Sequence, residues 1–229
     1  MGPTKFALVF IALPLALASQ PTGDFSQGID RWKIKTSVVH DPSTKPKAVA
    51  LDKLLKLGLL DKEQSGKVYE AERIPVAMPG GLHEGDIIST TGYLQLVALE
   101  RDENKRDGDY HMQLRLEKIW GDSCFIVEIP YPGFVTDKKL KALCTKARHD
   151  VLDLLDGAEP SESGKVLSPA IKVKVTGQLF YDAIHAKDMR NEDPDKRKYR
   201  GKKGNKNNPP MHSYTAWEIH PVFSVEKVK

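Results

Sequence analysis

The sequence predicts a mainly β fold with one long helix, arranged as a five-stranded barrel behind an irregular N-terminal extension. Five segments after residue 85 have the pattern of strands, and one segment between the third and the fourth has helical spacing. The 229 residues are 40% hydrophobic and 29% charged, close to the averages of soluble globular proteins. These fractions exclude disorder, collagen and coiled coil as descriptions of the whole chain.

Residues 1–18 have the pattern of a secretory signal peptide. Lys5 precedes an apolar run over residues 6–17, and Ala16-Leu17-Ala18 supplies the small residues that a signal peptidase accepts. The alternative is a membrane anchor, but about 12 apolar residues are fewer than the roughly 20 that span a bilayer. We therefore expect an exported protein, periplasmic or secreted, that has no membrane anchor after cleavage.

The N-terminal extension, residues 19–84, has few regular features. Residues 32–39 alternate as a short strand would, and residues 51–57 have the apolar spacing of a short helix that ends at Gly58. Prolines and glycines between residues 75 and 81 then interrupt the pattern. The sequence assigns this segment no role.

The first three strands follow one another closely. Residues 86–100 are rich in β-branched side chains, and Gly92 is placed for a bend or bulge. Residues 109–117 alternate strictly between apolar and polar side chains. Residues 123–130 form the third strand, which ends at a proline.

A helix is predicted from Thr136 to Leu155, with Thr136 as its N-cap and Gly157 as its stop. Residues 170–182 and 212–225 are the fourth and fifth strands. The order β-β-β-α-β-β is the chain order of an OB-fold barrel. An SH3-like barrel would lack a helix of this length, and a β-sandwich would need more strands. We therefore expect an OB-fold-like domain over residues 85–229.

A long basic loop, residues 184–212, joins the last two predicted strands. Connections beyond about 15 residues are uncommon in compact domains and are usually functional or disordered. Within this loop, residues 196–206, which we call the basic run, contain seven basic side chains and no acidic one. Removing the signal takes away only Lys5, so the formal charge of +4 minus 1 leaves +3, and because the basic run alone carries +7 the rest of the mature chain is net acidic. The predicted ligand-binding residues are Lys196, Arg197, Lys198, Tyr199, Arg200, Lys202, Lys203 and Lys206.

Two interpretations of the loop remain open. In OB barrels the loop between the fourth and fifth strands flanks the ligand-binding face, so a polyanion such as nucleic acid or an acidic polysaccharide is one partner. Tyr199 would then stack on a base. The alternative is a solvated loop whose lysines maintain solubility.

Polar side chains of the second, third and fifth strands are expected to share the outer face of the barrel. If Leu114, Val127 and Ile219 line the interior, the opposite parity faces out. This outer set consists of Asp109, His111, Gln113, Arg115, Glu128, Glu218 and His220. A hairpin that turns at Gly121 places Glu128 opposite Gln113.

This polar face also has two interpretations. Imidazole and carboxylate groups together suit a divalent metal or general acid–base catalysis, and the catalytic alternative uses Asp109, His111, Glu128, Glu218 and His220. Cross-strand ion pairs, such as one between Glu128 and Arg115, explain the same pattern, and no recognised metal-ligand spacing is present. We therefore assign no cofactor and no metal ligand, and a divalent metal enters only with the catalytic alternative.

The sequence contains two cysteines, Cys124 and Cys144, which exclude a disulfide-dense scaffold and a four-cysteine zinc site. Export would permit them to pair, and a bridge over a loop of that length would stabilise by roughly 3 kcal/mol. The alternative is two buried free thiols.

Two sequence segments carry a resemblance. Asp107-Gly-Asp-Tyr-His111, together with Trp217-Glu-Ile-His-Pro-Val222, resembles a group of exported bacterial proteins of uncharacterised function. The resemblance covers about residues 85–225 and implies export and an OB-like barrel, but no activity. Separately, Asp107-Gly108-Asp109 resembles the turn that helps to hold calcium in the staphylococcal-nuclease family, although Tyr110 replaces the usual threonine of that family.

Together these observations predict an exported, non-catalytic binding module for an anionic polymer or a protein partner. The alternative function is a metal-dependent nuclease or phosphodiesterase on the polar face. A structural protein that uses its surface for protein contacts is a third possibility, and the sequence determines neither the ligand nor the oligomeric state.

Overall fold

The computed structural model describes residues 31–60, 72–100, 107–118, 123–190, 198–202 and 211–229. In chain order the elements are α1 (Trp32–Lys35), β1 (Lys47–Ala48), α2 (Leu51–Leu55), β2 (Ile87–Leu99), β3 (Tyr110–Arg115), β4 (Phe125–Ile129), a 3-10 turn (Pro132–Phe134), α3 (Lys138–Leu154), β5 (Lys165–Tyr181), α4 (Ala183–Met189) and β6 (Trp217–Lys227). The predicted signal peptide and its cleavage site lie outside the described residues.

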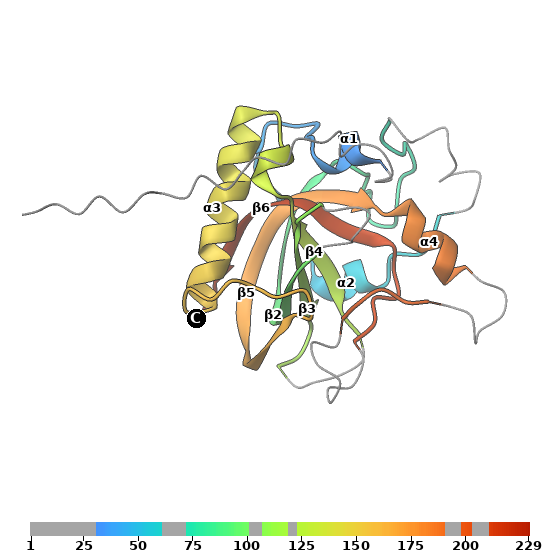
Figure 1. Cartoon of the computed structure of the whole chain (residues 1–229). Coiled ribbons are helices and arrows are strands. Elements are labelled where there is room, and N and C mark those ends of the chain that lie inside the picture. Colours follow the sequence, from blue (N-terminus) through green and yellow to red (C-terminus); the bar gives the residue numbers. More distant parts are fainter. Residues whose placement is uncertain (1–30, 61–71, 101–106, 119–122, 191–197, 203–210) are drawn as a thin grey trace, which may run out of the picture.

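Five strands close into a barrel, which confirms the predicted OB-fold-like architecture. The hydrogen-bonded order is β2-β3-β4-β6-β5, and β5 returns to pair with β2. The pairing of β4 with β6 is parallel, whereas the other four barrel pairings are antiparallel. Figure 1 shows α3 (yellow) standing against the barrel beside β6 and β5, while α4 (orange) lies on the opposite side.

Strand β2 closes the barrel because it is long enough to pair with β3 along one edge and with β5 along the other. The sequence predicts a bend or bulge at Gly92, but the register of β2 shifts between Leu94 and Leu96, so the bulge lies after Gly92. Gly92 instead permits close packing, because a Cβ there would lie 2.6 Å from Leu51 Cδ2 on α2.

Helix α3 covers the barrel with the predicted apolar face, through the buried side chains of Leu140, Cys144, Ala147 and Val151. Its N-cap is Asp137 and not Thr136, since the Asp137 carboxylate accepts a hydrogen bond of 2.7 Å from the Leu140 N–H. Gly157 follows the helix at φ 78°, a left-handed conformation that suits the predicted stop.

The extension is more regular than its sequence indicates, and it packs on the barrel. The predicted strand at residues 32–39 is wrong, because α1 forms there after Arg31 adopts a left-handed conformation. Strand β1 pairs in parallel with β2. The Arg31 guanidinium donates to both carboxylate oxygens of Glu84, at 2.6 and 2.7 Å, and both side chains are buried. The pair is fastened to β5 of the barrel, because the Arg31 guanidinium also donates to the Tyr181 carbonyl at 2.7 Å and Glu84 accepts from the Tyr181 N–H at 2.9 Å.

Candidate functional site

Six of the seven polar residues predicted for one face of the barrel gather in one place, as the strand alternation requires, and the seventh, Arg115, is buried at the end of β3. We call this group the polar cluster; its members are Asp109, His111, Gln113, Glu128, Glu218 and His220. His111 pairs directly with Glu128 across β3 and β4, so the predicted pairing of Glu128 with Gln113 is wrong by two residues. The parallel pairing of Val127 with Ile219 brings Glu218 and His220 of β6 alongside Glu128.

The polar cluster does not face solvent, contrary to the sequence-based expectation. Its six members are at most 2% exposed. Lys35 of α1 covers one side, with its ammonium 3.7 Å from Asp109 Oδ2 and 3.7 Å from Glu128 Oε2. Arg200 covers another side, since its guanidinium donates to Glu218 and lies 3.3 Å from Glu128 Oε1. The expectation failed because these two cations come from segments that are distant in sequence.

Glu128 connects the two histidines, with one carboxylate oxygen for each ring. Its Oε1 lies 2.9 Å from His111 Nδ1, and its Oε2 lies 3.1 Å from His220 Nδ1. The second nitrogen of His111 lies 3.0 Å from the Gln113 side-chain oxygen. The Gln113 amide is oriented by its hydrogen bonds with the backbone N–H and C=O of Lys202, which point its oxygen toward His111. Both nitrogens of His111 therefore face acceptors, which is the environment of an imidazolium.

The cluster shifts the pKa values of its histidines upward. Burial by itself lowers the pKa of His111, but its hydrogen bonds to Glu100 and Glu128 outweigh burial and raise the pKa to about 9. For His220, burial and the Lys35 charge lower the pKa, whereas the hydrogen bonds to Glu128 and Glu218 raise it to about 9. Both rings are therefore cationic at neutral pH.

The carboxylates divide into two kinds. Burial would raise the pKa of Glu128, but Lys35 and the hydrogen bonds from the two histidines hold it well below its usual range. For Asp109, burial raises the pKa to about 6 although His220 and Lys35 oppose the shift. For Asp107, burial and the Asp109 charge raise the pKa to about 8. Glu128 is therefore the carboxylate that the cations of the cluster hold ionised most strongly, whereas the pKa values of Asp109 and Asp107 are raised by burial.

Two sets of side chains have the donor types and spacing of a cation site. One is Asp109, Glu128 and His220, and the other is Glu100, His111 and Glu128, with ligand atoms within 4.8 Å of one another in each set. Asp109 Oδ2 and His220 Nε2 are buried without a hydrogen-bond partner and lie 3.6 Å apart. The Lys35 ammonium already places a positive charge beside Asp109 and Glu128, so a divalent ion there would have to displace it.

The described part of the basic run splits between the surface and the interior. Lys198 and Tyr199 are exposed, whereas the Arg200 side chain is 4% exposed and serves as a counterion of the polar cluster. Lys202 is partly buried, and its ammonium lies 3.5 Å from Glu100 Oε1. The remaining predicted ligand-binding residues, Lys196, Arg197, Lys203 and Lys206, lie outside the described residues.

Three aromatic rings gather at the surface next to Lys198. We call them the aromatic platform: Tyr199, His212 and Tyr214, with ring centroids 4.8 to 6.0 Å apart. Tyr199 and Tyr214 are 37% and 42% exposed. The Ser213 N–H donates to the Arg200 carbonyl at 2.7 Å and joins the two segments of the platform, and the Cys124 N–H donates to the His212 carbonyl at 2.9 Å and holds it beside β4. The sequence singled out Tyr199 alone, since His212 and Tyr214 fell in the predicted fifth strand, which begins only at Trp217.

The predicted disulfide is not formed, and the alternative of two buried thiols describes the structure. Cys144 belongs to the main core beneath α3, while Cys124 packs in a separate small cluster with Leu96, Ala98 and Met211. Burial raises the pKa of each thiol to about 12. Neither cysteine therefore supplies a reactive thiolate.

Comparisons of this chain with protein-family models, with curated proteins and with solved structures found no match. In the part of the chain that the structure describes, no helix is long and apolar enough to cross a membrane.

Proposed function

We propose that this protein is an exported, non-catalytic binding module for an anionic polymer, and that single-stranded nucleic acid is the form of ligand the geometry favours. The observation that carries the proposal is the aromatic platform, in which two exposed tyrosines stand next to a basic run. Stacking on aromatic rings combined with lysine and arginine contacts to the backbone is how OB folds hold single strands.

The position of the platform supports this assignment. Tyr199 and the basic run lie between β5 and β6, which are the fourth and fifth barrel strands, in the loop that flanks the ligand-binding face of OB folds. Residues 196–206 contain seven basic side chains and no acidic one. Among the described residues of this run, Arg200 is a buried counterion, Lys202 pairs with Glu100, and Lys198 is exposed. In this proposal the polar cluster has a structural role, because its hydrogen bonds with Arg200 and Lys202 fix the backbone that carries Tyr199.

The test is the binding of a fluorescent oligo(dT) strand to the chain without residues 1–18. Tyr199→Ala and Tyr214→Ala should each weaken binding by about 1–3 kcal/mol, the usual contribution of one stacked base. Tyr199→Phe keeps the ring and should bind as the unmodified chain does. Equal affinities of Tyr199→Ala and Tyr199→Phe would contradict stacking. Heparin in place of oligo(dT) distinguishes an acidic polysaccharide, whose binding should not depend on the rings.

A metal-dependent phosphodiesterase on the polar cluster is the second candidate. The observation that favours it is the pair of buried atoms without a hydrogen-bond partner, Asp109 Oδ2 and His220 Nε2, in a set of metal-ligand type. Its weakness is access, since a substrate would reach this set only if Lys35 or Arg200 moved away. Cleavage that requires a divalent ion, stops with chelator and is lost in His111→Ala and Glu218→Ala would establish the enzyme. A chain that neither binds nor cleaves would point to a protein partner instead.

A further inference from the structure

Residues of the N-terminal extension line a pocket of about 440 Å³, and this lining shares no residue with the polar cluster or the aromatic platform. It lies between β1, α2 and the turn at residues 79–82. Its lining residues include Lys47, Val49, Lys53, Lys56, Leu57 and Leu82. A volume of this size is within the range of small-molecule sites.

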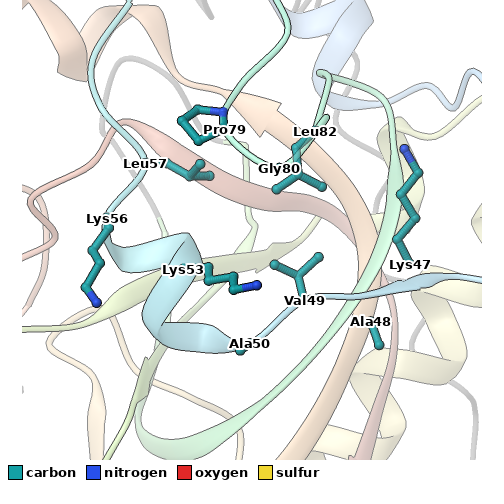
Figure 2. Close-up of a pocket in the computed structure, with 10 residues that line it drawn as sticks. All are labelled: Lys47, Ala48, Val49, Ala50, Lys53, Lys56, Leu57, Pro79, Gly80 and Leu82. Carbon is teal, nitrogen blue, oxygen red and sulfur yellow. The ribbon is translucent and has the colours of Figure 1, made fainter.

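The pocket has an apolar base and a cationic rim. Leu57 and Leu82 are 4% and 5% exposed and belong to the main hydrophobic core, so the base of the pocket is continuous with the core. Figure 2 shows the Lys53 side chain extending from α2 toward Val49, with Leu57 and Leu82 above them in this view. The lining carries no acidic residue.

The three lysines of the rim differ in their partners. Lys47 pairs with Asp86 at 2.8 Å, and Lys56 lies 3.6 Å from Asp52 one helical turn away. Lys53 is an exposed side chain that lines the pocket, and none of the described carboxylates pairs with it, so its ammonium has no counterion from that part of the chain. An apolar cavity with one such cation is complementary to a molecule that has an aliphatic chain and an anionic head.

We propose that this pocket binds a free aliphatic carboxylate of medium chain length, with its chain against Leu57 and Leu82 and its carboxylate on Lys53. The chain removes apolar surface from water, and the carboxylate forms a charge-assisted hydrogen bond with the Lys53 ammonium. The extension thereby acquires a role as a ligand-binding unit, which is separate from polymer binding by the basic run.

The test is calorimetric titration of the chain without residues 1–18 with decanoate, decanol and acetate. Decanoate should bind, decanol should bind about tenfold more weakly because it lacks the charge, and acetate should not bind because it lacks the chain. Lys53→Gln should weaken decanoate binding about tenfold, whereas Lys45→Gln, which removes an exposed lysine outside the pocket, should leave it unchanged.

A second measurement does not depend on a folded variant. Decanoate should slow the reductive methylation of Lys53 in the unmodified chain, measured by mass spectrometry, and should leave the rate at Lys45 unchanged. Absence of decanoate binding would overturn the proposal. Equal affinities for decanoate and decanol, or an undiminished affinity in Lys53→Gln, would show that Lys53 does not recognise a carboxylate and would overturn it as well.

Discussion

Arg200→Met should destabilise the protein by about 3–5 kcal/mol at pH 7, because it removes one partner of a buried ion network. The Arg200 side chain is 4% exposed and donates to Glu218. It also lies 3.3 Å from a Glu128 oxygen and 3.5 Å from an Asp182 oxygen. Methionine retains the apolar stem of arginine. The expected destabilisation therefore comes from a buried negative charge that lacks its counterion, and not from lost hydrophobic contact.

The assay is urea unfolding at pH 7, followed by tryptophan fluorescence, with Lys198→Met as the matched control. Lys198 is exposed two residues away, and its substitution should change the free energy of unfolding by less than about 0.5 kcal/mol. The folded protein holds the pKa values of Glu128 and Asp182 below their usual range, so their contribution to stability is present above their unfolded pKa values of about 4. This contribution is lost as the pH falls, and the cost of Arg200→Met should shrink below that pH.

The pair with Glu218 can be isolated by a double-mutant cycle. Arg200→Met combined with Glu218→Gln should cost less than the sum of the two single substitutions, because each single change leaves a buried charge that the other removes. If Arg200→Met costs no more than Lys198→Met, or if the cycle shows no coupling, the buried network does not stabilise the fold as described.

Three further predictions concern the core of the protein. The pKa values of His111 and His220 are raised to about 9, so the stability they contribute is present below their unfolded value of about 6.5 and lost as the pH rises through 9. Unfolding free energies measured from pH 6.5 to 9.5 should therefore decrease, and less steeply in His111→Gln; a flat profile would contradict the shifts. Gly177→Ala should destabilise by about 1–3 kcal/mol in urea unfolding, because its Cβ would lie 2.4 Å from Ile219 Cγ2, while Gly58→Ala meets nothing within 4 Å and should cost little. Thiol titration should detect two free thiols after unfolding without reductant and neither in the folded protein; a single disulfide would refute the separate burial of the cysteines.

The barrel was predictable because its determinants are local. Residues 109–117 alternate strictly, and the structure has β3 within that range. The stripe of α3 and its stop at Gly157 are visible at helical spacing in the same way. Segment 32–39 shows the limit of such patterns, because a few alternating residues cannot be distinguished from the short helix that Arg31 initiates.

The candidate site was predictable in its membership but not in its burial. Strand parity correctly places Asp109, His111 and Glu128 on one face, because that face is a local property. Strand parity contains no information on which side chains cover that face. The covering side chains are Lys35, 74 residues before Asp109, and Arg200, 91 residues after it. Such long-range pairing requires the folded chain.

The central claim is that the loop between β5 and β6 binds an anionic polymer by stacking and charge. The most direct measurement is the affinity of the chain without residues 1–18 for labelled single-stranded and double-stranded DNA across a salt series, with and without calcium, magnesium or manganese, and with cleavage recorded in the same samples. If the loop binds in this way, the chain should prefer the single strand, its affinity should fall steeply with salt, and no cleavage should occur. Neutralising the basic side chains from Lys196 to Lys206 other than Arg200 and Lys202, which pair with Glu218 and Glu100, should abolish binding. Cleavage that depends on the divalent ion, or an affinity for neither form of DNA, would contradict the central claim.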